Sequence, residues 1–362
     1  MGERQLVLVG GGHAHALVLR TWAQHGRPRA RIVLVSPEAH SPYSGMLPGH
    51  VAGHYGWGEM HVDLARLAAR AGVERIEDRV VGLDLARRRA MLERGQALAF
   101  DLLSLDTGST SGLPGLEAAV PVKPLGPFLQ RWSAFVAAPR GEVRVVGGGL
   151  GGIELALAMA HRLAGQVPVT LVERGERIAP TLAPHVQAKL AAVLAAAGVT
   201  VRTRTSAETL DAAAGFTVAA AGARPAPWLA AAGLGLDPAG FVRVDAHLRS
   251  VTHPAVFAAG DVAHMDASPR EKAGVFAVRQ GPVLARILAA GVDGEPLPDF
   301  RPQTDYLRLI SLGRKRALAV KYGRAVGGTG PLGALLWRWK DRIDRGFMAA
   351  VGTAADRAPS DA

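Results

Sequence analysis

The chain contains no cysteine among its 362 residues. This absence excludes disulfide scaffolds, redox-active cysteine pairs, thiolate nucleophiles, cysteine zinc sites and cysteine-ligated iron–sulfur clusters. Histidine remains available, and His50 and His54 would share one face of a helix. Because no third and fourth ligand follow at a suitable spacing, we predict that the chain has no metal site.

Long hydrophobic runs are also missing. The longest mostly apolar stretch, residues 190–201, has twelve residues, whereas a bilayer-spanning helix needs ~20. The N-terminus passes from Glu3 and Arg4 directly into a short strand-like run, without the basic, apolar and small-residue regions of a cleavable signal. We therefore expect a cytoplasmic protein, with peripheral attachment to the inner membrane face as the alternative.

Negative charge is scarce near the C-terminus. The formal net charge is +11, and residues 301–362 hold twelve Arg/Lys and five Asp/Glu, so +7 of it lies there. A local excess of positive charge favours an anionic membrane surface or an acidic partner. The basic run at residues 314–316 is interpreted as a solvated turn, because no nucleic-acid-binding motif accompanies it, and we expect no nucleic-acid partner.

A strand–glycine–helix–strand pattern occurs twice in the chain, 137 residues apart. A buried strand that leads through glycines into a helix and then into a second strand is the β-α-β unit of a parallel sheet. Two such units predict an α/β protein with two Rossmann-like, three-layer nucleotide-binding domains. The first copy comprises residues 5–9, 10–12, 14–20 and 31–35, and the second comprises residues 143–146, 147–152, 153–163 and 169–172.

The second copy contains a complete G-x-G-x-x-G motif formed by Gly147, Gly149 and Gly152. These glycines allow a tight turn, a close backbone approach to a pyrophosphate and close packing of helix on strand. Glu173 ends the next strand, 21 residues after Gly152, where a carboxylate can accept hydrogen bonds from a ribose. The motif predicts a dinucleotide site that prefers NADH to NADPH, although the neighbouring Arg174 weakens that preference.

The first copy departs from the motif. Gly10 and Gly12 fit, but His15 stands at the third glycine position, and Ser36 replaces the acid that usually ends the second strand. On this copy alone, a turn without a ligand remains an open alternative.

A first set of further segments comprises residues 105–109 (LDTGS), 222–225 (GARP), 240–245 (GFVRVD) and 256–261 (VFAAGD). This set resembles the pyridine nucleotide-disulfide oxidoreductase superfamily, the flavoproteins with two dinucleotide-binding domains. A second set comprises residues 9–15 (VGGGHAH), 41–49 (SPYSGMLPG), 272–282 (KAGVFAVRQGP) and 337–344 (WRWKDRID). This second set is similar to one branch of that superfamily, which is associated with selenide, water dikinase and resembles the type II NADH dehydrogenases.

The resemblance implies FAD at the first glycine loop and NAD(P)H at the second. It also implies that Asp261 binds the flavin ribitol and that the helix entered at Lys272 and Ala273 points its N-terminus at the flavin. Glu154 matches a carboxylate near the nicotinamide, although it could instead simply complement the helix dipole. Glu154 and Lys272 are the candidate catalytic residues. Other cofactor-binding residues implied by the resemblance are Gly10, Gly12, His13, Ser36, Pro37, Ser44, Gly45, Met46, Val80, Thr107, Gly108, Gly222 and Gly260.

The resemblance further implies a discontinuous FAD domain formed by residues 1–112 and 246–300, with the NAD(P)H domain, residues 113–245, inserted between them. Residues 301–362 would form a C-terminal region. Because the chain lacks cysteine, reduced flavin would pass electrons directly to a small acceptor such as a quinone. The alternatives are a soluble reductase for a protein or selenium-related acceptor and a non-catalytic, nucleotide-bound redox sensor.

The C-terminal region contains a predicted amphipathic helix. Leu336, Trp339, Ile343 and Phe347 are spaced 3, 4 and 4 residues apart, which places them in one apolar stripe beside basic residues. Such a helix is typical of peripheral membrane contact. The alternative is that the stripe packs on the body of the protein or on a second subunit of a homodimer. Residues 353–362 are predicted to be disordered.

Overall fold

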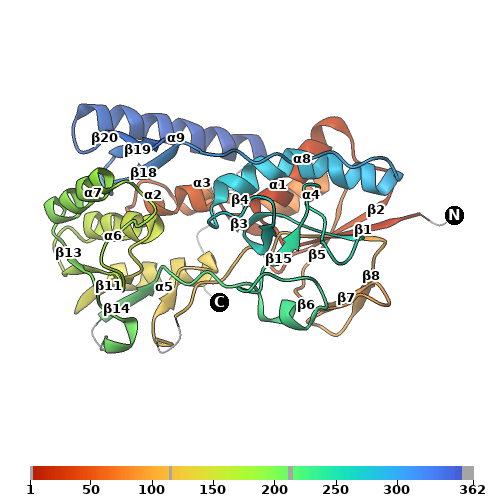
Figure 1. The fold of residues 1–362 in the computed structure, drawn as a ribbon, viewed down its shortest axis with the longest axis horizontal. Coiled ribbons are helices and arrows are strands. Elements are labelled where there is room, and N and C mark those ends of the chain that lie inside the picture. The colour runs from red at the N-terminus through yellow and green to blue at the C-terminus, as the bar shows by residue number, and fades with distance from the viewer. Residues whose placement is uncertain (1–2, 114–115, 211–214, 353–362) are drawn as a thin grey trace.

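The computed structural model describes residues 3–113, 116–210 and 215–352. The predicted disorder of residues 353–362 concerns a segment outside these residues. Figure 1 shows two lobes, each built around its own sheet, with the C-terminal helix lying along the top of the molecule.

The first lobe contains a five-stranded parallel sheet in the order β16–β9–β1–β2–β5. Residues 6–9 and 32–35 are buried along their whole length, which is expected for a parallel sheet covered on both faces. Strand β16 lies next to β9, although about 150 residues separate them in sequence. The strands are β1 (Gln5–Val9), β2 (Arg31–Val35), β5 (Glu74–Ile76), β9 (Leu102–Leu105) and β16 (Val256–Ala258).

Two long helices of this lobe pack against each other, α1 (His13–His25) and α8 (Gly274–Asp293). Their contact is close at Gly281, where a Cβ atom would lie 2.5 Å from the Cβ of Leu17. Among the described residues, α8 alone has the length and hydropathy of a membrane-spanning helix, and half of its apolar window is buried inside the molecule. Its apolar character is therefore used in packing within the lobe.

Short elements complete the first lobe. The pair β3–β4 and the sheet β6–β7–β8 are antiparallel, and β15–β17 is a parallel pair. Their bounds, with those of the short helices, are β3 (His40–Pro42), η1 (Ser44–Met46), α2 (Leu47–Val51), α3 (Trp57–Met60), β4 (His61–Asp63), α4 (Leu64–Arg70), β6 (Val80–Asp84), β7 (Arg89–Leu92), β8 (Ala97–Ala99), η3 (Pro227–Ala231), β15 (Val242–Val244), η4 (Gly260–Val262) and β17 (Ala263–Met265).

The second lobe repeats the architecture with the parallel sheet β10–β14–β11–β12–β13. The two glycine loops occupy equivalent places, between β1 and α1 and between β11 and α6. The predicted fold class, two Rossmann-like α/β units, is confirmed. The elements are β10 (Val120–Pro121), α5 (Leu125–Ala137), β11 (Glu142–Val146), α6 (Leu150–Leu163), β12 (Val169–Val172), α7 (Pro184–Ala196), β13 (Val199–Arg202), η2 (Ala207–Thr209) and β14 (Gly215–Ala219).

The C-terminal region consists of an antiparallel sheet and one helix. The sheet contains β18 (Arg308–Ser311), β19 (Ala317–Lys321) and β20 (Arg324–Gly327), and helix α9 (Pro331–Val351) packs on all three strands and also contacts α1 and α3. In Figure 1, α9 extends from above the second lobe to the first. This helix therefore covers the junction between the lobes.

Candidate active site

The first glycine loop, residues 10–12, packs closely against Asp106 at the end of strand β9. Gly10 has a φ of +91°, and a Cβ atom there would lie 2.5 Å from the carbonyl oxygen of Asp106. A Cβ atom on Gly12 would lie 2.4 Å from the Asp106 carboxylate. Real Cβ atoms do not approach other atoms so closely, so both positions require glycine.

Asp106 is a site residue that the sequence analysis did not single out, although it belongs to the LDTGS segment. Its carboxylate accepts a hydrogen bond from the backbone N–H of His15 at 2.9 Å, at the start of α1. Burial raises the pKa of Asp106 to about 7, and the neighbouring Asp261 adds to the rise, while the backbone N–H groups of His15 and Ala14 oppose it. A buried carboxyl therefore lies where the loop, α1 and β9 meet.

His15, at the third glycine position, is a structural residue in this arrangement. Its Nδ1 lies 2.7 Å from the Gly10 carbonyl oxygen and its Nε2 lies 2.8 Å from Ser104 Oγ. Because a carbonyl can only accept, Nδ1 donates and Nε2 accepts from the serine. Burial lowers the pKa of His15 to about 4, so the imidazole is neutral and ties the loop to β9.

The surroundings of this loop fit an FAD. The hydroxyl oxygen Oγ1 of Thr107 is buried without a hydrogen-bond partner, and a bound polar group could satisfy it. Gly108, with a φ of +68°, has open space where a Cβ atom would stand. Ser36 directly follows β2 and precedes Pro37, and its hydroxyl donates to the Glu38 carbonyl at 3.2 Å. Val80 begins β6 and is buried.

The second glycine loop has the geometry that its motif predicts. A Cβ atom on Gly152 would lie 1.8 Å from the Gly147 carbonyl oxygen, whereas one on Gly149 would have open space around it. The Glu173 carboxylate accepts from the backbone N–H groups of Gly148 and Gly175, both at 2.7 Å. Helix α6 begins at this loop without a side-chain cap, so its N-terminal N–H groups can bind a phosphate.

Asp261 forms an ion pair that the sequence analysis missed. Lys123, which precedes α5, pairs with its carboxylate, and the Ser109 hydroxyl donates to the same oxygen at 2.9 Å. Burial alone would raise the pKa of Asp261, but Lys123 and Ser109 outweigh it and hold that pKa below its ordinary value. Asp261, which is expected to bind the ribitol, is thus an ionised acceptor. It is paired with Lys123, which belongs to the segment that leads into the second lobe.

A cavity of about 900 Å³ lies between the lobes and beneath α9. Six predicted site residues line it. Gly260 and Asp261 line a small adjoining pocket that shares Lys272 and Ala273 with the cavity. Both glycine-loop units therefore contribute residues to one shared space. The six residues are Ser44, Gly45, Glu154, Gly222, Lys272 and Ala273.

Glu154 and Lys272 both line this cavity, and each is hydrogen-bonded to the backbone. The Lys272 ammonium donates to the Ala263 carbonyl at 2.7 Å and lies 3.8 Å from the centre of the Phe241 ring. Burial lowers its pKa to about 8. The Glu154 carboxylate accepts from the backbone N–H of Ser311 in β18 at 2.7 Å. Burial raises the pKa of Glu154, against the opposing effect of Lys340.

Other predicted residues lie behind the cavity wall. Met46 is fully buried, and His13 accepts a long, 3.4 Å hydrogen bond from the Ser44 backbone N–H while its ring meets Tyr43 edge to face. Gly10, Gly12 and Thr107 are grouped around Asp106, and Gly147 and Glu173 are grouped at the second loop. Among the residues that the structure describes, no group of three or more His, Asp or Glu side chains could hold a metal ion.

Helix α9 closes one side of the cavity, and the predicted apolar stripe is divided between solvent and the protein. Trp339 and Ile343 of the predicted stripe are 48% and 46% exposed, and Leu332 and Leu335 are 49% and 58% exposed. Phe347, at the edge of the stripe, stacks on Tyr43. The stripe neither packs fully on the body nor leaves it. Leu336 is half-buried and lies close to Gly327 of β20. The inward face of α9 holds Lys340 and Asp344 together with the buried Met348 and Val351.

Comparisons with known proteins agree with this geometry. The sequence matches the family described as pyridine nucleotide-disulphide oxidoreductase over residues 4–281. The chain is 28% identical, over 84% of its length and 78% of the relative's, to the ferredoxin–NAD(+) reductase component of the biphenyl dioxygenase system of Paraburkholderia xenovorans. It is 26% identical to a monodehydroascorbate reductase of Arabidopsis thaliana and to the demethylphylloquinone reductase NdbB of Synechocystis. These two matches cover 72% and 56% of this chain but only 60% and 54% of the relatives.

Solved structures share the whole fold. The NDH2 of Plasmodium falciparum, solved in complex with NADH, superimposes with a TM-score of 0.78 at 12% identity and covers 97% of this chain and 98% of its own. The sequence match, the two glycine loops and the shared cavity lead to one conclusion. The chain belongs to the pyridine nucleotide-disulphide oxidoreductase family.

Proposed function

We propose that the protein is an FAD-dependent NADH oxidoreductase that passes electrons from the flavin directly to a small acceptor. The observation that carries this proposal is the cavity of about 900 Å³, which joins residues from both glycine-loop units. Lys272 and Ala273 reach it from the first unit, and Gly151 and Glu154 reach it from the second. A shared cavity is what transfer between two bound coenzymes requires, because the reacting groups must meet away from water.

The residues of the first loop would hold FAD. Gly10 and Gly12 allow its phosphates to approach the backbone, Thr107 offers an unpaired hydroxyl, and Asp261 offers fixed acceptors to the ribitol. The N-terminus of α8 enters the cavity at Ala273 and would favour negative charge on the flavin. When bound, the flavin supplies the hydride and electron chemistry.

The residues of the second loop would hold NADH. Gly147, Gly149 and Gly152 form the phosphate cradle, and Glu173 is fixed by two backbone N–H groups where it would accept from the ribose hydroxyls. A carboxylate at this position opposes a 2′-phosphate, which favours NADH over NADPH. Gly222 and Glu154, both in the cavity wall, would border the nicotinamide.

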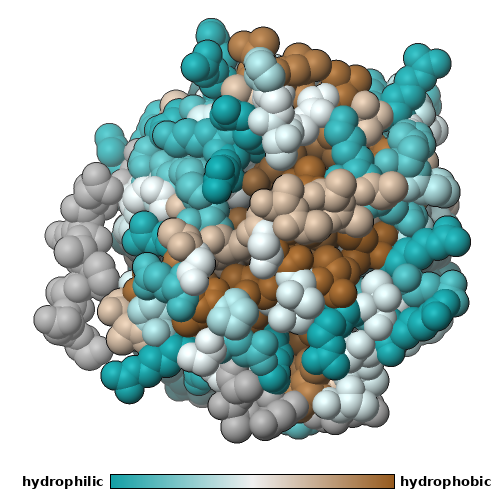
Figure 2. All heavy atoms as spheres, turned by 90° about the vertical axis from the view of Figure 1, so that its left-hand side faces the viewer, coloured by the Kyte–Doolittle hydropathy of each residue, from teal (hydrophilic) through white to brown (hydrophobic). Residues whose placement is uncertain are grey.

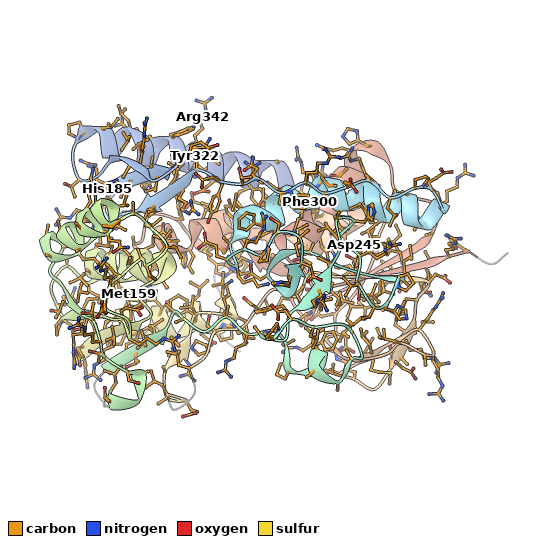
Figure 3. The ribbon with its side chains drawn as sticks, viewed as in Figure 1. Met159, His185, Asp245, Phe300, Tyr322 and Arg342 are labelled. Atoms are coloured by element: carbon orange, nitrogen blue, oxygen red, sulfur yellow. The ribbon has the colours of Figure 1, made fainter. Side chains whose placement is uncertain are left out.

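A quinone-like molecule is the acceptor that the C-terminal helix favours. Ile343 lines the cavity and also belongs to the exposed apolar side of α9, so one apolar surface leads from solvent to the cavity. In Figure 3, Arg342 projects from α9 away from the body, and Figure 2 shows hydrophobic atoms at the top of the face where α9 begins. We propose peripheral contact of this helix with the cytoplasmic face of an anionic membrane. The quinone reductase of Synechocystis is a relative named for such an acceptor.

A soluble reductase for a protein acceptor is the second candidate. It is favoured by the similarity to a ferredoxin–NAD(+) reductase component and by the basic C-terminal region. A selenium-related acceptor and a nucleotide-bound sensor without turnover remain alternatives that the same assays separate.

For the chain organisation, we propose an FAD domain of residues 1–112 and 246–300, an NAD(P)H domain of residues 113–245 and a C-terminal region from residue 301. The pairing of β16 with β9 supports a discontinuous FAD domain. The contacts of η3 with β6 and of β15 with β17 favour a return of the chain to that domain before residue 246.

The acceptor assay tests this proposal. The purified protein should carry FAD and should oxidise NADH when given a short-chain benzoquinone, with a lower kcat/KM for NADPH. A higher rate with a small acidic iron–sulfur protein than with any quinone would favour the second candidate. Absence of NADH oxidation with every acceptor, in protein that retains its flavin, would favour the sensor.

A further inference from the structure

A group of basic side chains lies apart from the cavity, where both lobes meet the C-terminal region. Helix α2 of the first lobe packs on α6 of the second, and α6 and α9 both contact β18. Figure 1 shows these elements at the same end of the molecule. None of the side chains in question lines the cavity or its adjoining pocket. The members of this junction cluster are His54, His161, Arg162, Arg314, Lys315 and Trp337.

Aromatic contacts connect the members of the junction cluster. The ring of His54 lies 5.1 Å from that of His161 and 5.8 Å from that of Trp337, measured between centroids. The Lys315 ammonium lies 5.4 Å from the centre of the Trp337 ring. His54 Nε2 donates to the Gly313 carbonyl at 2.8 Å, which leaves its Nδ1 free for a ligand. Four segments that are distant in sequence thus form one continuous group.

The two arginines extend this group. The Arg162 guanidinium reaches the end of α2, because a Cβ atom on Gly53 would lie only 2.7 Å from its Nη1. Arg314 and Lys315 occupy the turn between β18 and β19 and are exposed. Within the described part of the chain, the side chains of Arg162, Arg314 and Lys315 form no ion pair. Their charges are therefore not neutralised by the protein.

The two histidines experience the field of these cations. Burial lowers the pKa of His161, and the charges of Arg314 and Arg162 lower it further. Burial also lowers the pKa of His54, and Lys315 adds to that effect. Positive charge raises the free energy of a protonated imidazole. The shifts agree with the geometry, in which cations from several elements converge.

Local structure explains only part of the junction cluster. The carbonyl end of α6 attracts cations, which accounts for His161 and Arg162 in its last turn. It does not account for Arg314 and Lys315, which come from another segment. On α9, the Asp341 carboxylate is already hydrogen-bonded by a tyrosine and an arginine. Like charges gathered without a counter-charge destabilise the folded protein, and a bound anion would relieve that repulsion.

A small phosphate-bearing molecule fits this arrangement best. A phosphate group carries about −1.5 to −2 charges near neutral pH and has three acceptor oxygens, so it can meet cations that approach from several sides. A carboxylate presents two oxygens in one plane, which a single guanidinium can engage. Trp337 faces the body of the protein, where it stacks on the buried Tyr55, whereas Trp339 is 48% exposed. The junction cluster therefore lies away from the apolar side of α9, which favours a small anion over a bilayer.

We propose that the junction cluster is a binding site for a small phosphate-bearing anion. The inference is independent of the function proposed above, since it uses no residue of the cavity or of the glycine loops. The bound anion contacts both lobes and the C-terminal region at once, and it thereby stabilises their arrangement around the cavity.

Lys315→Gln tests the proposal, and Lys321→Gln is the matched control. The two lysines flank β19, both are exposed, and each lies beside an aromatic ring, at 5.4 Å from Trp337 and 5.1 Å from Tyr322. Each substitution therefore removes one charge and one cation–π contact. Only Lys315→Gln removes a charge from the junction cluster. The melting temperature (Tm) is measured in potassium phosphate and in potassium chloride of equal ionic strength.

The glycine loops also bind phosphates, so every protein is kept loaded with FAD and saturated with NAD+. Orthophosphate at about ten times its dissociation constant should raise the Tm of the native protein by about 2 °C over chloride. Lys321→Gln should respond equally, whereas Lys315→Gln should lose the response and bind orthophosphate at least about tenfold more weakly by calorimetry. In chloride, Lys315→Gln should melt about 1 °C above Lys321→Gln, because it relieves repulsion.

Histidine NMR provides a readout that does not depend on stability. The ring signal of His161 is identified by its absence in His161→Gln. Orthophosphate should raise the pKa of His161, because the anion offsets the charges of Arg314 and Arg162 that lower it. In Lys315→Gln the same addition should leave that pKa in place.

Three outcomes would overturn the proposal. Equal responses to orthophosphate in the native protein and both variants would indicate a general salt effect. A native protein that responds to orthophosphate no more than to chloride would have no such site. Stabilisation by phosphatidylglycerol vesicles without any response to orthophosphate would identify a lipid surface as the partner instead. Because none of these measurements involves NADH oxidation, they remain decisive if the proposed function fails.

Discussion

Asp106→Asn should change how the stability of the protein depends on pH. In the native protein, burial raises the pKa of Asp106 from 3.8 to about 7. A carboxyl with a raised folded-state pKa contributes stability that is complete below its unfolded pKa and is lost as pH rises through its folded pKa. Asparagine does not titrate, so the variant lacks this dependence.

The size of the effect follows from the pKa difference. A difference of about 3 between the folded and unfolded states corresponds to about 4 kcal/mol, at about 1.4 kcal/mol for each pKa unit. The free energy of unfolding of Asp106→Asn, relative to the native protein, should therefore rise by up to about 4 kcal/mol between about pH 4 and about pH 7 and stay constant above that range. The asparagine Oδ1 can still accept from the His15 N–H, so the start of α1 keeps its hydrogen bond.

His15 provides the internal control. Its pKa is lowered to about 4 by burial, so it contributes stability that grows as pH rises from about 4 toward its unfolded value of 6.5, the opposite sign to Asp106. Both proteins contain His15, and its contribution cancels in their difference. Urea denaturation of the two proteins, at equal flavin loading and a series of pH values, measures that difference. A difference that does not vary with pH would refute the protonated, buried state of Asp106.

Three further predictions concern the nucleotide site and the membrane. Glu173→Ala should narrow the preference for NADH over NADPH about tenfold, because it removes a charged hydrogen-bond acceptor worth ~1.5–3 kcal/mol. An unchanged ratio of the kcat/KM values for NADH and NADPH would refute the assignment of Glu173 as the ribose-binding carboxylate. Gly152→Ala should slow flavin reduction by NADH at least about tenfold, since its Cβ would lie 1.8 Å from a carbonyl oxygen, whereas Gly346→Ala, an exposed position on α9 with open space for a Cβ, should leave that rate unchanged. Trp339→Ser should weaken sedimentation with anionic vesicles roughly tenfold. Val81→Ser, which changes an exposed apolar position on β6, should not weaken it. Equal sedimentation of the native protein and the two variants would exclude α9 as the membrane-contacting helix.

The sequence was sufficient to predict the elements whose cause is local. Gly152 meets a steric requirement set within its own loop, because its Cβ would meet the Gly147 carbonyl, and Gly147 has a φ of +125°. The strands beside them are mostly buried, so the two β-α-β units could be recognised. The ends of the helices differ slightly, since α6 begins at Leu150, before the predicted start at residue 153. The hydrogen bonds of Glu173 follow from the same local register.

The residues that the sequence did not reveal depend on contacts between distant segments. Asp106 becomes important only because β9 brings its carboxylate to Gly12 and His15, 91 residues earlier. Lys123 reaches Asp261 across 138 residues. The local sequence around Asp106 or Lys123 does not indicate these contacts.

The orientation of α9 had a different cause. Hydrophobic periodicity identifies an apolar stripe but does not state which side of a helix faces the protein. Lys340 and Asp344 are bonded to Gly45 and Tyr43 in the cavity wall, and their inward position turns Trp339 and Ile343 toward solvent. The charged residues, which the sequence analysis considered only as neighbours of the stripe, share the inward face with the buried Met348 and Val351.

Anaerobic mixing of the purified protein with NADH tests the central claim most directly. If both coenzymes bind in the shared cavity, one equivalent of NADH should bleach the oxidised-flavin absorbance of one equivalent of protein, and NADPH should do so more slowly. A protein that binds FAD but keeps its oxidised spectrum in excess NADH would contradict the account.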